Sequence, residues 1–316
     1  MRISVQSGSL FSPQYIEETG KVEAGPYCLE EGMEMLATAG FEGIDLNLNS
    51  LLPSKQIRME QTGGFFSLDE ADMLGALRPY RETAQKYGLS FVQAHAPFPN
   101  YVNDPRAREY VRHAVEKCIL LCGYLDCPRL IVHGGSKPYL ERMSQEEERR
   151  YNLDMYASFI PELKKHHVVC CLENLFSRHR GRIIESFCAD PHDAIFYIDT
   201  LNEMAGERCF GFCLDTGHVN ILSRDIYTIV TLLGDRIVAL HVNDNNGLED
   251  EHLFPYMGTV CWERFLRAMK EIKYRHDLNF ETFHGLDTFD PELAPQLLDL
   301  LHATGSMFRR RICEKA

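Results

Sequence analysis

The sequence predicts a single (β/α)8 barrel, that is, a TIM barrel. Eight short apolar runs alternate with eight longer amphipathic stretches, which is the order produced when each parallel strand is followed by a helix. The length of 316 residues suits one such barrel, which usually takes about 250 residues and more when its loops are extended. An open doubly wound sheet is the alternative, but eight strand–helix units favour closure. No G-x-G-x-x-G motif follows the first strand, so the usual dinucleotide site is not indicated.

The expected strands are nearly continuous apolar runs, as in a parallel sheet covered by helices. They are Arg2–Gln6, Gly43–Leu48, Ser90–His95, Arg129–His133, Val168–Leu172, Gly211–Asp215, Ile237–Val242 and Leu278–Glu281. The expected helices are Leu29–Ala39, Asp72–Tyr87, Ala107–Leu125, Gln145–His166, Pro191–Met204, Ile226–Leu233, Trp262–Lys273 and Pro291–His302. With no linker or low-complexity tract between them, residues 1–316 are expected to form one domain.

Two long connections follow the first two strands, Ser7–Cys28 and Asn49–Ser67, and contain aromatic residues that look exposed, such as Phe11 and Phe65. In a barrel these loops overhang the mouth where active sites lie, so they are candidates for a substrate lid. A solvated surface insertion is the alternative.

Composition limits the function. Hydrophobic residues make up 45% and charged residues 25%, and the formal net charge is −13, which argues against a protein that holds a long phosphate backbone. Eleven cysteines without a C-x-x-C pair are expected to be reduced core residues of a cytoplasmic protein. The first residues read as a strand rather than a signal segment, and no apolar run approaches the ~20 residues of a membrane span.

Histidine and acidic residues gather at the ends of six consecutive expected strands. Barrel enzymes build their sites at this C-terminal face, because closure brings the strand ends together around one axis. A lone residue of this kind is often only a cap, but six together indicate a shared site. The six are His95, His133, Glu173, Asp215, His241 and Glu281.

We predict that Glu173, Asp215, His241 and Glu281 bind a divalent metal ion. The set contains imidazole and carboxylates but no thiolate, which suits Zn, Mn, Fe, Co or Mg and disfavours a structural zinc site. On a six-coordinate ion this set leaves positions open for two neighbouring oxygen atoms of a substrate.

The order of these motifs resembles the xylose-isomerase-like barrel superfamily, which contains sugar and sugar phosphate isomerases and epimerases as well as endonuclease IV. The resemblance rests on Leu-Glu173-Asn, Leu-Asp215-Thr-Gly-His218, His241-Val-Asn-Asp and Glu281-Thr, and it extends from the first strand to the eighth. By this resemblance the four ligands hold one Mn or Co ion, Glu173 and Glu281 are the catalytic proton-transfer pair, and His218 contacts the sugar.

One departure concerns the segment after the seventh strand. The ketose epimerases carry an arginine there, whereas this chain reads Asp250-Glu251-His252, which is similar to endonuclease IV. By that second resemblance His95 and His133 join Glu173 at one ion, and His218, Asp250 and His252 hold another, so that between one and three ions of Mn, Zn or Co are implied. We assign His95, His133, His218, Asp250 and His252 as substrate-binding candidates. A charged surface turn is the alternative for Asp250 and His252.

A basic segment follows Glu173 and contains Arg178, His179, Arg180 and Arg182. These side chains could meet a phosphate or an acidic sugar, or only solvate a loop, and the sequence favours neither interpretation.

The predicted function is a metal-dependent isomerase or epimerase of a small sugar, polyol ketone or sugar phosphate. A carboxylate removes a proton beside a carbonyl group, and the metal stabilises the resulting enediolate. The expected partner is a small carbohydrate, with neither nucleic acid nor membrane, and homo-oligomerisation is left open. The alternatives are a three-metal phosphodiesterase like endonuclease IV, a lyase-like relative acting on ketosugar glycosides, and a non-catalytic carbohydrate-binding barrel.

Overall fold

Eight parallel strands form the barrel in a computed structural model that describes residues 1–314. The hydrogen-bonded order is β11-β10-β7-β6-β5-β4-β1-β12. Backbone hydrogen bonds from Val242 N to Asn279 O (2.9 Å) and from Glu281 N to Val242 O (3.1 Å) close the remaining seam. The predicted (β/α)8 barrel is therefore confirmed. Its strands are β1 (Ile3–Gln6), β4 (Gly43–Asn47), β5 (Ser90–His95), β6 (Arg129–Ile131), β7 (Val169–Glu173), β10 (Phe210–Asp215), β11 (Ile237–His241) and β12 (Leu278–Phe280).

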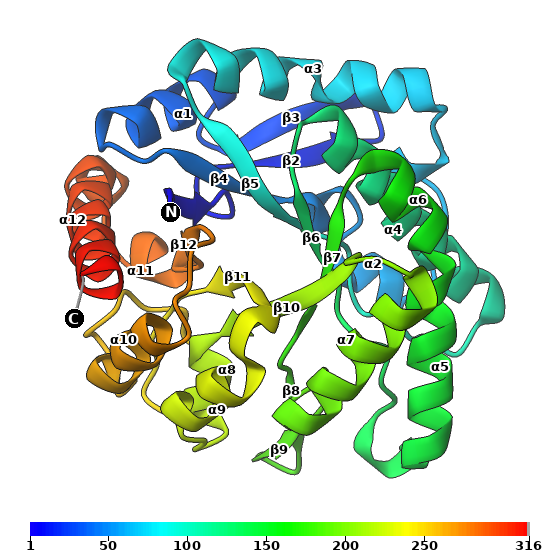
Figure 1. Cartoon of the computed structure of the whole chain (residues 1–316). Helices are drawn as coiled ribbons and strands as arrows, with labels where there is room; N and C mark the ends of the chain where they lie inside the picture. The colour runs from blue at the N-terminus through cyan, green and yellow to red at the C-terminus, as the bar shows by residue number, and fades with distance from the viewer. Residues whose placement is uncertain (315–316) are drawn as a thin grey trace.

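Helices surround the barrel, and Figure 1 shows the last long helix next to the first, so that the ring of helices also closes. Each buries one apolar face against the strands, as amphipathic helices do. The helices are α1 (Leu29–Thr38), α2 (Ser54–Arg58), α3 (Glu70–Tyr87), α4 (Pro105–Tyr124), α5 (Gln145–Ser158), α6 (Ile160–His166), α7 (Pro191–Ala205), α8 (Thr216–Ile221), α9 (Ile226–Leu233), α10 (Trp262–Glu271), α11 (Phe283–Asp287) and α12 (Ala294–Cys313).

Two expected helices differ from the observed ones by more than two residues at a boundary. The helix expected over 145–166 is divided at Phe159, because Pro161 lies in the first turn of α6 and has no N–H with which to continue the hydrogen bonds of α5. The last helix begins three residues later than expected, after a 3-10 turn at Pro291–Leu293, and it continues to Cys313 because Phe308 and Ile312 remain on its buried face.

The two long connections are folded segments. The first contains the hairpin of β2 (Phe11–Ile16) and β3 (Lys21–Pro26), and the second contains α2. Phe11 and Phe65, which looked exposed in the sequence, are 0% exposed and belong to the core. A second hairpin, β8 (Phe176–His179) and β9 (Arg182–Glu185), follows β7. The second connection and the β8–β9 hairpin both contribute residues to the cavity at the mouth of the barrel, Arg58 and Phe176 among them.

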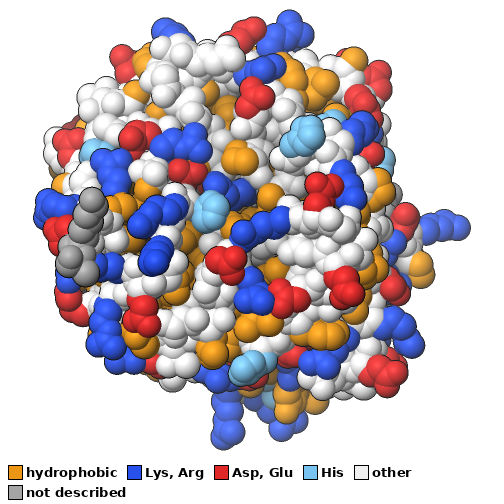
Figure 2. Space-filling model, viewed as in Figure 1, with side chains coloured by type: hydrophobic (Ala, Val, Ile, Leu, Met, Phe, Trp, Pro, Cys, Tyr) orange, Lys and Arg blue, Asp and Glu red, His pale blue; other side chains and the backbone are white. Residues whose placement is uncertain are grey.

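The surface carries both signs of charge. Figure 2 shows acidic and basic side chains interspersed over one face of the molecule. None of the helices described within residues 1–314 combines the length and the apolar character needed to cross a bilayer.

Candidate metal centre

The ends of β7, β10, β11 and β12 bring together the four residues that were predicted as metal ligands. Each offers one ligand atom, and these atoms lie within 4.8 Å of one another. His241 Nδ1 is 2.9 Å from Glu173 Oε1 and 3.2 Å from Glu281 Oε2. None of the four residues is more than 6% exposed. The set is Glu173, Asp215, His241 and Glu281.

The chemistry of this set fits a divalent cation. Three carboxylates share a buried space with one imidazole, and buried charges are costly unless an opposite charge compensates them. Burial raises the pKa of Asp215 and raises that of Glu281 to about 7. Burial acts in the same direction on Glu173, but the neighbouring His241 and further histidines outweigh it and hold the pKa of Glu173 well below its usual value.

A fully buried aspartate supports the centre from below. Asp45 Oδ2 on β4 lies 3.3 Å from His241 Nε2, and it accepts hydrogen bonds from Gln93 Nε2 (2.9 Å) and Asn279 Nδ2 (2.8 Å). If a proton on Nε2 is shared with Asp45, the lone pair of His241 Nδ1 would be available to a metal ion held by the carboxylates above. Carboxylate partners of this kind fix the tautomer and orientation of metal-binding histidines. Asp45 is not among the site residues predicted from the sequence.

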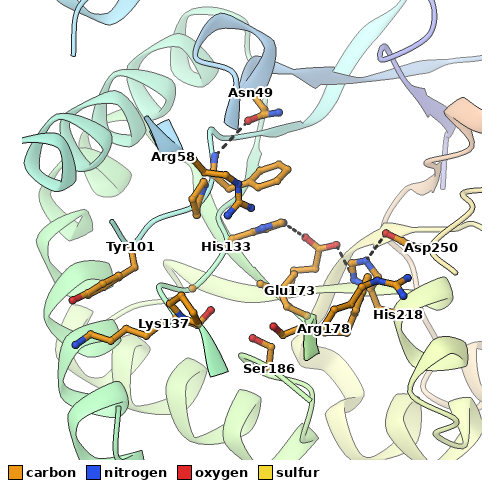
Figure 3. Close-up of a pocket in the computed structure, with 18 of the residues that line it drawn as sticks. Asn49, Arg58, Tyr101, His133, Lys137, Glu173, Arg178, Ser186, His218 and Asp250 are labelled. Carbon is orange, nitrogen blue, oxygen red and sulfur yellow. Dashed lines mark hydrogen bonds and ion pairs between the residues drawn. The ribbon is translucent and has the colours of Figure 1, made fainter. Parts of the chain in front are cut away.

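His95 and His133 lie beside Glu173, as predicted. His133 Nε2 is 2.9 Å from Glu173 Oε2 and 3.1 Å from His95 Nε2 (Figure 3). His95 donates from Nδ1 to Ala96 O (2.8 Å), so its Nε2 also faces the centre. Burial lowers the pKa of His133 to about 4, which keeps this imidazole neutral. Neutral imidazole is the form that binds metal ions.

The remaining three candidates form a second group at the opposite side of Glu173. Asp250 Oδ2 lies 3.2 Å from His252 Nε2 and 3.5 Å from His218 Nε2. His218 Nδ1 and His252 Nδ1 donate to backbone carbonyls of Asn174 (2.8 Å) and Glu281 (3.0 Å). Burial lowers the pKa of His252, but the hydrogen bond to Asp250 outweighs it and raises the value to about 9. Asp250 and His252 are therefore organised side chains rather than a solvated turn.

Asp244 fixes the loop that carries Asp250 and His252. Its carboxylate accepts hydrogen bonds from Tyr256 N (3.0 Å), Val260 N (3.0 Å) and Trp262 Nε1 (2.9 Å). These bonds tie the chain before the loop to the chain after it, which explains how a long irregular segment can place two site residues.

A cavity of about 840 Å³ opens above these groups. Three phenylalanines form its walls, and each backs one histidine. Ring centroids are 4.4 Å apart for Phe98 and His133, 5.1 Å for Phe176 and His218, and 4.2 Å for Phe283 and His252. The cavity therefore has a polar floor and partly apolar walls, as small-molecule sites usually do.

Curated relatives share parts of the sequence. The chain is 28% identical over 230 residues to an uncharacterized protein of Methanocaldococcus jannaschii, covering 70% of this chain and 74% of that protein. It is also 38% identical over 72 residues to an uncharacterized protein of Sinorhizobium fredii. This match covers 23% of each of the two chains.

Solved structures share the fold at low identity. An L-ribulose 3-epimerase superposes with a TM-score of 0.69 at 17% identity, with 98% of this chain and 95% of the other covered. The IOLI protein, crystallised with a zinc atom, superposes with a TM-score of 0.67 at 14% identity, with 99% and 98% covered.

The family model described as xylose isomerase-like TIM barrel matches residues 33–303, a span that includes every predicted site residue. Together with the closed barrel and the cluster at its C-terminal mouth, this match shows that the chain belongs to the xylose isomerase-like TIM barrel family.

Proposed function

We propose that this chain is a divalent-metal-dependent isomerase or epimerase of a small sugar, polyol ketone or sugar phosphate. The observation that carries the proposal is the position of two buried glutamates beside one imidazole, with Glu173 Oε1 and Glu281 Oε2 at 2.9 and 3.2 Å from His241 Nδ1, on the floor of a cavity suited to a small molecule. The fold shared with an L-ribulose 3-epimerase supports the same reaction class.

Glu173, Asp215, His241 and Glu281 would hold the ion, and Mn, Zn or Co suits this donor set. A bound ion would polarise the substrate carbonyl and compensate the negative charge that develops on its oxygen. Glu173 and Glu281 act as the catalytic pair, one removing a proton from the carbon next to the carbonyl and the other returning it. The neighbouring side chains orient the hydroxyl groups of the substrate; they are His95, His133, His218, Asp250 and His252.

A second candidate function is a metal phosphodiesterase. It is favoured by the two further groups beside the centre, His95 and His133 next to Glu173, and Asp250 between His218 and His252, which offer places for up to three ions. The net charge of −13 supports the isomerase instead, since a nucleic-acid substrate calls for basic surface. We expect the metal-loaded protein not to incise an abasic duplex; incision would reverse the ranking.

We further propose that residues 1–316 act as one domain in the cytoplasm. The barrel and both N-terminal insertions share one hydrophobic core, which includes Phe11 and Phe65. All eleven cysteines are free thiols, which suits a reducing compartment.

Proton exchange with solvent tests the reaction class. Metal-loaded protein is incubated in D₂O with ketopentoses, ketohexoses, inosose-type ketones and their phosphates, and NMR follows the hydrogen on the carbon beside the carbonyl. We expect the true substrate to exchange this hydrogen. Glu281→Gln should abolish exchange while substrate still binds, because the amide keeps the shape but cannot accept a proton; the exposed Glu292→Gln is the control. Turnover without deuterium in the product, or full activity of Glu281→Gln, would contradict the proposal.

A further inference from the structure

We propose that the substrate carries an anionic group, a phosphate or a carboxylate, which Arg58 and Lys137 bind at the rim of the cavity while the sugar part lies over the floor. This inference rests on the proposed function and specifies its substrate class. The cavity is larger than the metal centre alone requires. About 840 Å³ is at the upper end of the volumes of small-molecule sites, roughly 300–1,000 Å³, and the metal centre occupies only its floor.

Three basic side chains line the cavity, and one of them already forms an ion pair. Arg178, Arg58 and Lys137 all line the cavity. Arg178 already binds Glu249, with distances of 2.6 and 3.3 Å between nitrogen and oxygen atoms. Within residues 1–314, Arg58 and Lys137 form neither an ion pair nor a side-chain hydrogen bond. Beyond the floor carboxylates and Asp250, Glu141 is the one carboxylate among the described lining residues.

These two cations come from different connections of the chain. Arg58 ends α2, and Lys137 lies between β6 and α5. Figure 3 draws Arg58 and Lys137 on the side of Glu173 away from Asp250 in this view, with Lys137 beside Tyr101. The Lys137 ammonium group lies 5.3 Å from the centroid of the Tyr101 ring, an aromatic contact that restrains it.

Neutral residues that can donate hydrogen bonds line the cavity as well. They include Ser136, Ser177 and Ser186. A guanidinium group binds phosphate or carboxylate through two parallel hydrogen bonds, and an ammonium group adds a point charge. The protein as a whole carries −13 and repels anions, so local cations at the entrance are what an anionic substrate requires.

Matched ligands test the inference on the metal-loaded protein. Calorimetry measures binding of inorganic phosphate first, and then of D-fructose, D-fructose 6-phosphate and D-fructuronate, which present one ketose skeleton with no charge, a phosphate and a carboxylate. We expect inorganic phosphate to bind, and one charged sugar to bind at least about tenfold more tightly than D-fructose, a difference that high salt reduces. The better of the two charged sugars identifies the anion.

The variants Arg58→Gln and Lys137→Gln should each weaken phosphate and charged-sugar binding about tenfold, with metal content and D-fructose binding unchanged. Arg180→Gln, in the turn of the β8–β9 hairpin and outside the cavity lining, is the matched control and should have no effect. Phosphate binding that depends on the metal but is unaffected by both variants would overturn the inference, as would equal binding of all three sugars.

The reaction class and the anion subsite are tested by different measurements. If no ketose exchanges hydrogen with solvent although the metal is bound, the isomerase assignment is wrong. Loss of phosphate binding in the two variants would still support the anion subsite in that case.

Discussion

Asp45 Oδ2 and His241 Nε2 lie 3.3 Å apart beneath the metal centre, and neither side chain is exposed to solvent. If His241 binds a metal ion through Nδ1, as we propose, Asp45 is placed to share the proton on Nε2 and so to fix the tautomer of the ligand. The candidate metal centre would then extend one layer deeper than its four proposed ligands, into β4.

Asp45→Asn should weaken metal binding by about 10- to 100-fold, the usual effect of removing such a partner. The neutral amide fills the same space, so the barrel should still fold. Competition with a chelator measures the affinity, and the visible spectrum of the Co²⁺ form reports the ligand geometry. Asp277→Asn, a buried aspartate that pairs with Arg2 instead, is the control and should leave both readouts unchanged. Equal affinities for Asp45→Asn and the parent would remove the positioning role of Asp45.

Removing a ligand should abolish stabilisation by the metal. We expect purified protein to contain a divalent ion, and at a free metal concentration about 100 times the Kd that ion stabilises the fold by about 2.7 kcal/mol. Thermal unfolding with and without EDTA should therefore differ for the parent and coincide for His241→Ala. Absence of metal in elemental analysis, with EDTA changing neither stability nor activity, would contradict the site.

The number of ions should depend on the group around Asp250. We expect His252→Ala to lose one metal equivalent while the ion at Glu173 and Glu281 remains, because His252 Nε2 and His218 Nε2 both face Asp250. Elemental analysis after loading and desalting gives the stoichiometry. An unchanged metal content would assign these residues to substrate binding alone.

Acid should lower the free energy of unfolding by protonating Asp277, which lies at the end of the barrel opposite the candidate metal centre. Burial raises the pKa of its carboxyl group, but hydrogen bonds from Arg2 outweigh this and hold the pKa at about 2. A lowered pKa in the folded chain means that the group stabilises the fold above about pH 4, and that this contribution, about 2 kcal/mol, is lost as the pH falls towards 2. Asp277→Asn should be less stable by this amount in urea unfolding at pH 7, and the difference should shrink between pH 4 and pH 2. A difference that is constant with pH would show that the ion pair is not its source.

The fold and the cluster could be predicted where an apolar strand pattern ends in a histidine or an acidic residue. The apolar strands predicted the barrel. Because closure brings the strand ends together around one axis, His241 and Glu281 could be predicted to lie in one cluster. Asp45 was missed because its role depends on contacts with Gln93 and Asn279 from other strands, which no local pattern encodes. The same is true of Arg58, whose position over the cavity depends on how its loop packs.

Some element boundaries depend on capping residues and prolines, which the apolar pattern alone does not include. Asp69 accepts a hydrogen bond from Asp72 N and begins α3 earlier than the apolar pattern suggested. The break before Pro161 could also have been inferred from the missing N–H. The hairpin β8–β9 was not predicted. Its strands are largely half exposed and lack the apolar alternation that would distinguish them from a loop.

The hydrogen bond from Gln6 to Glu281 joins residues 275 positions apart, in the first and last parts of the barrel. Because a contact of such sequence separation carries a large loop-closure cost, it belongs among the slow events of folding. Gln6 on β1 can hold the Glu281 carboxylate only after β1 has paired with β12. Acquisition of high-affinity metal during refolding should therefore coincide with the final closure of the ring, and the ion can serve as a kinetic probe of when the two termini of the chain meet.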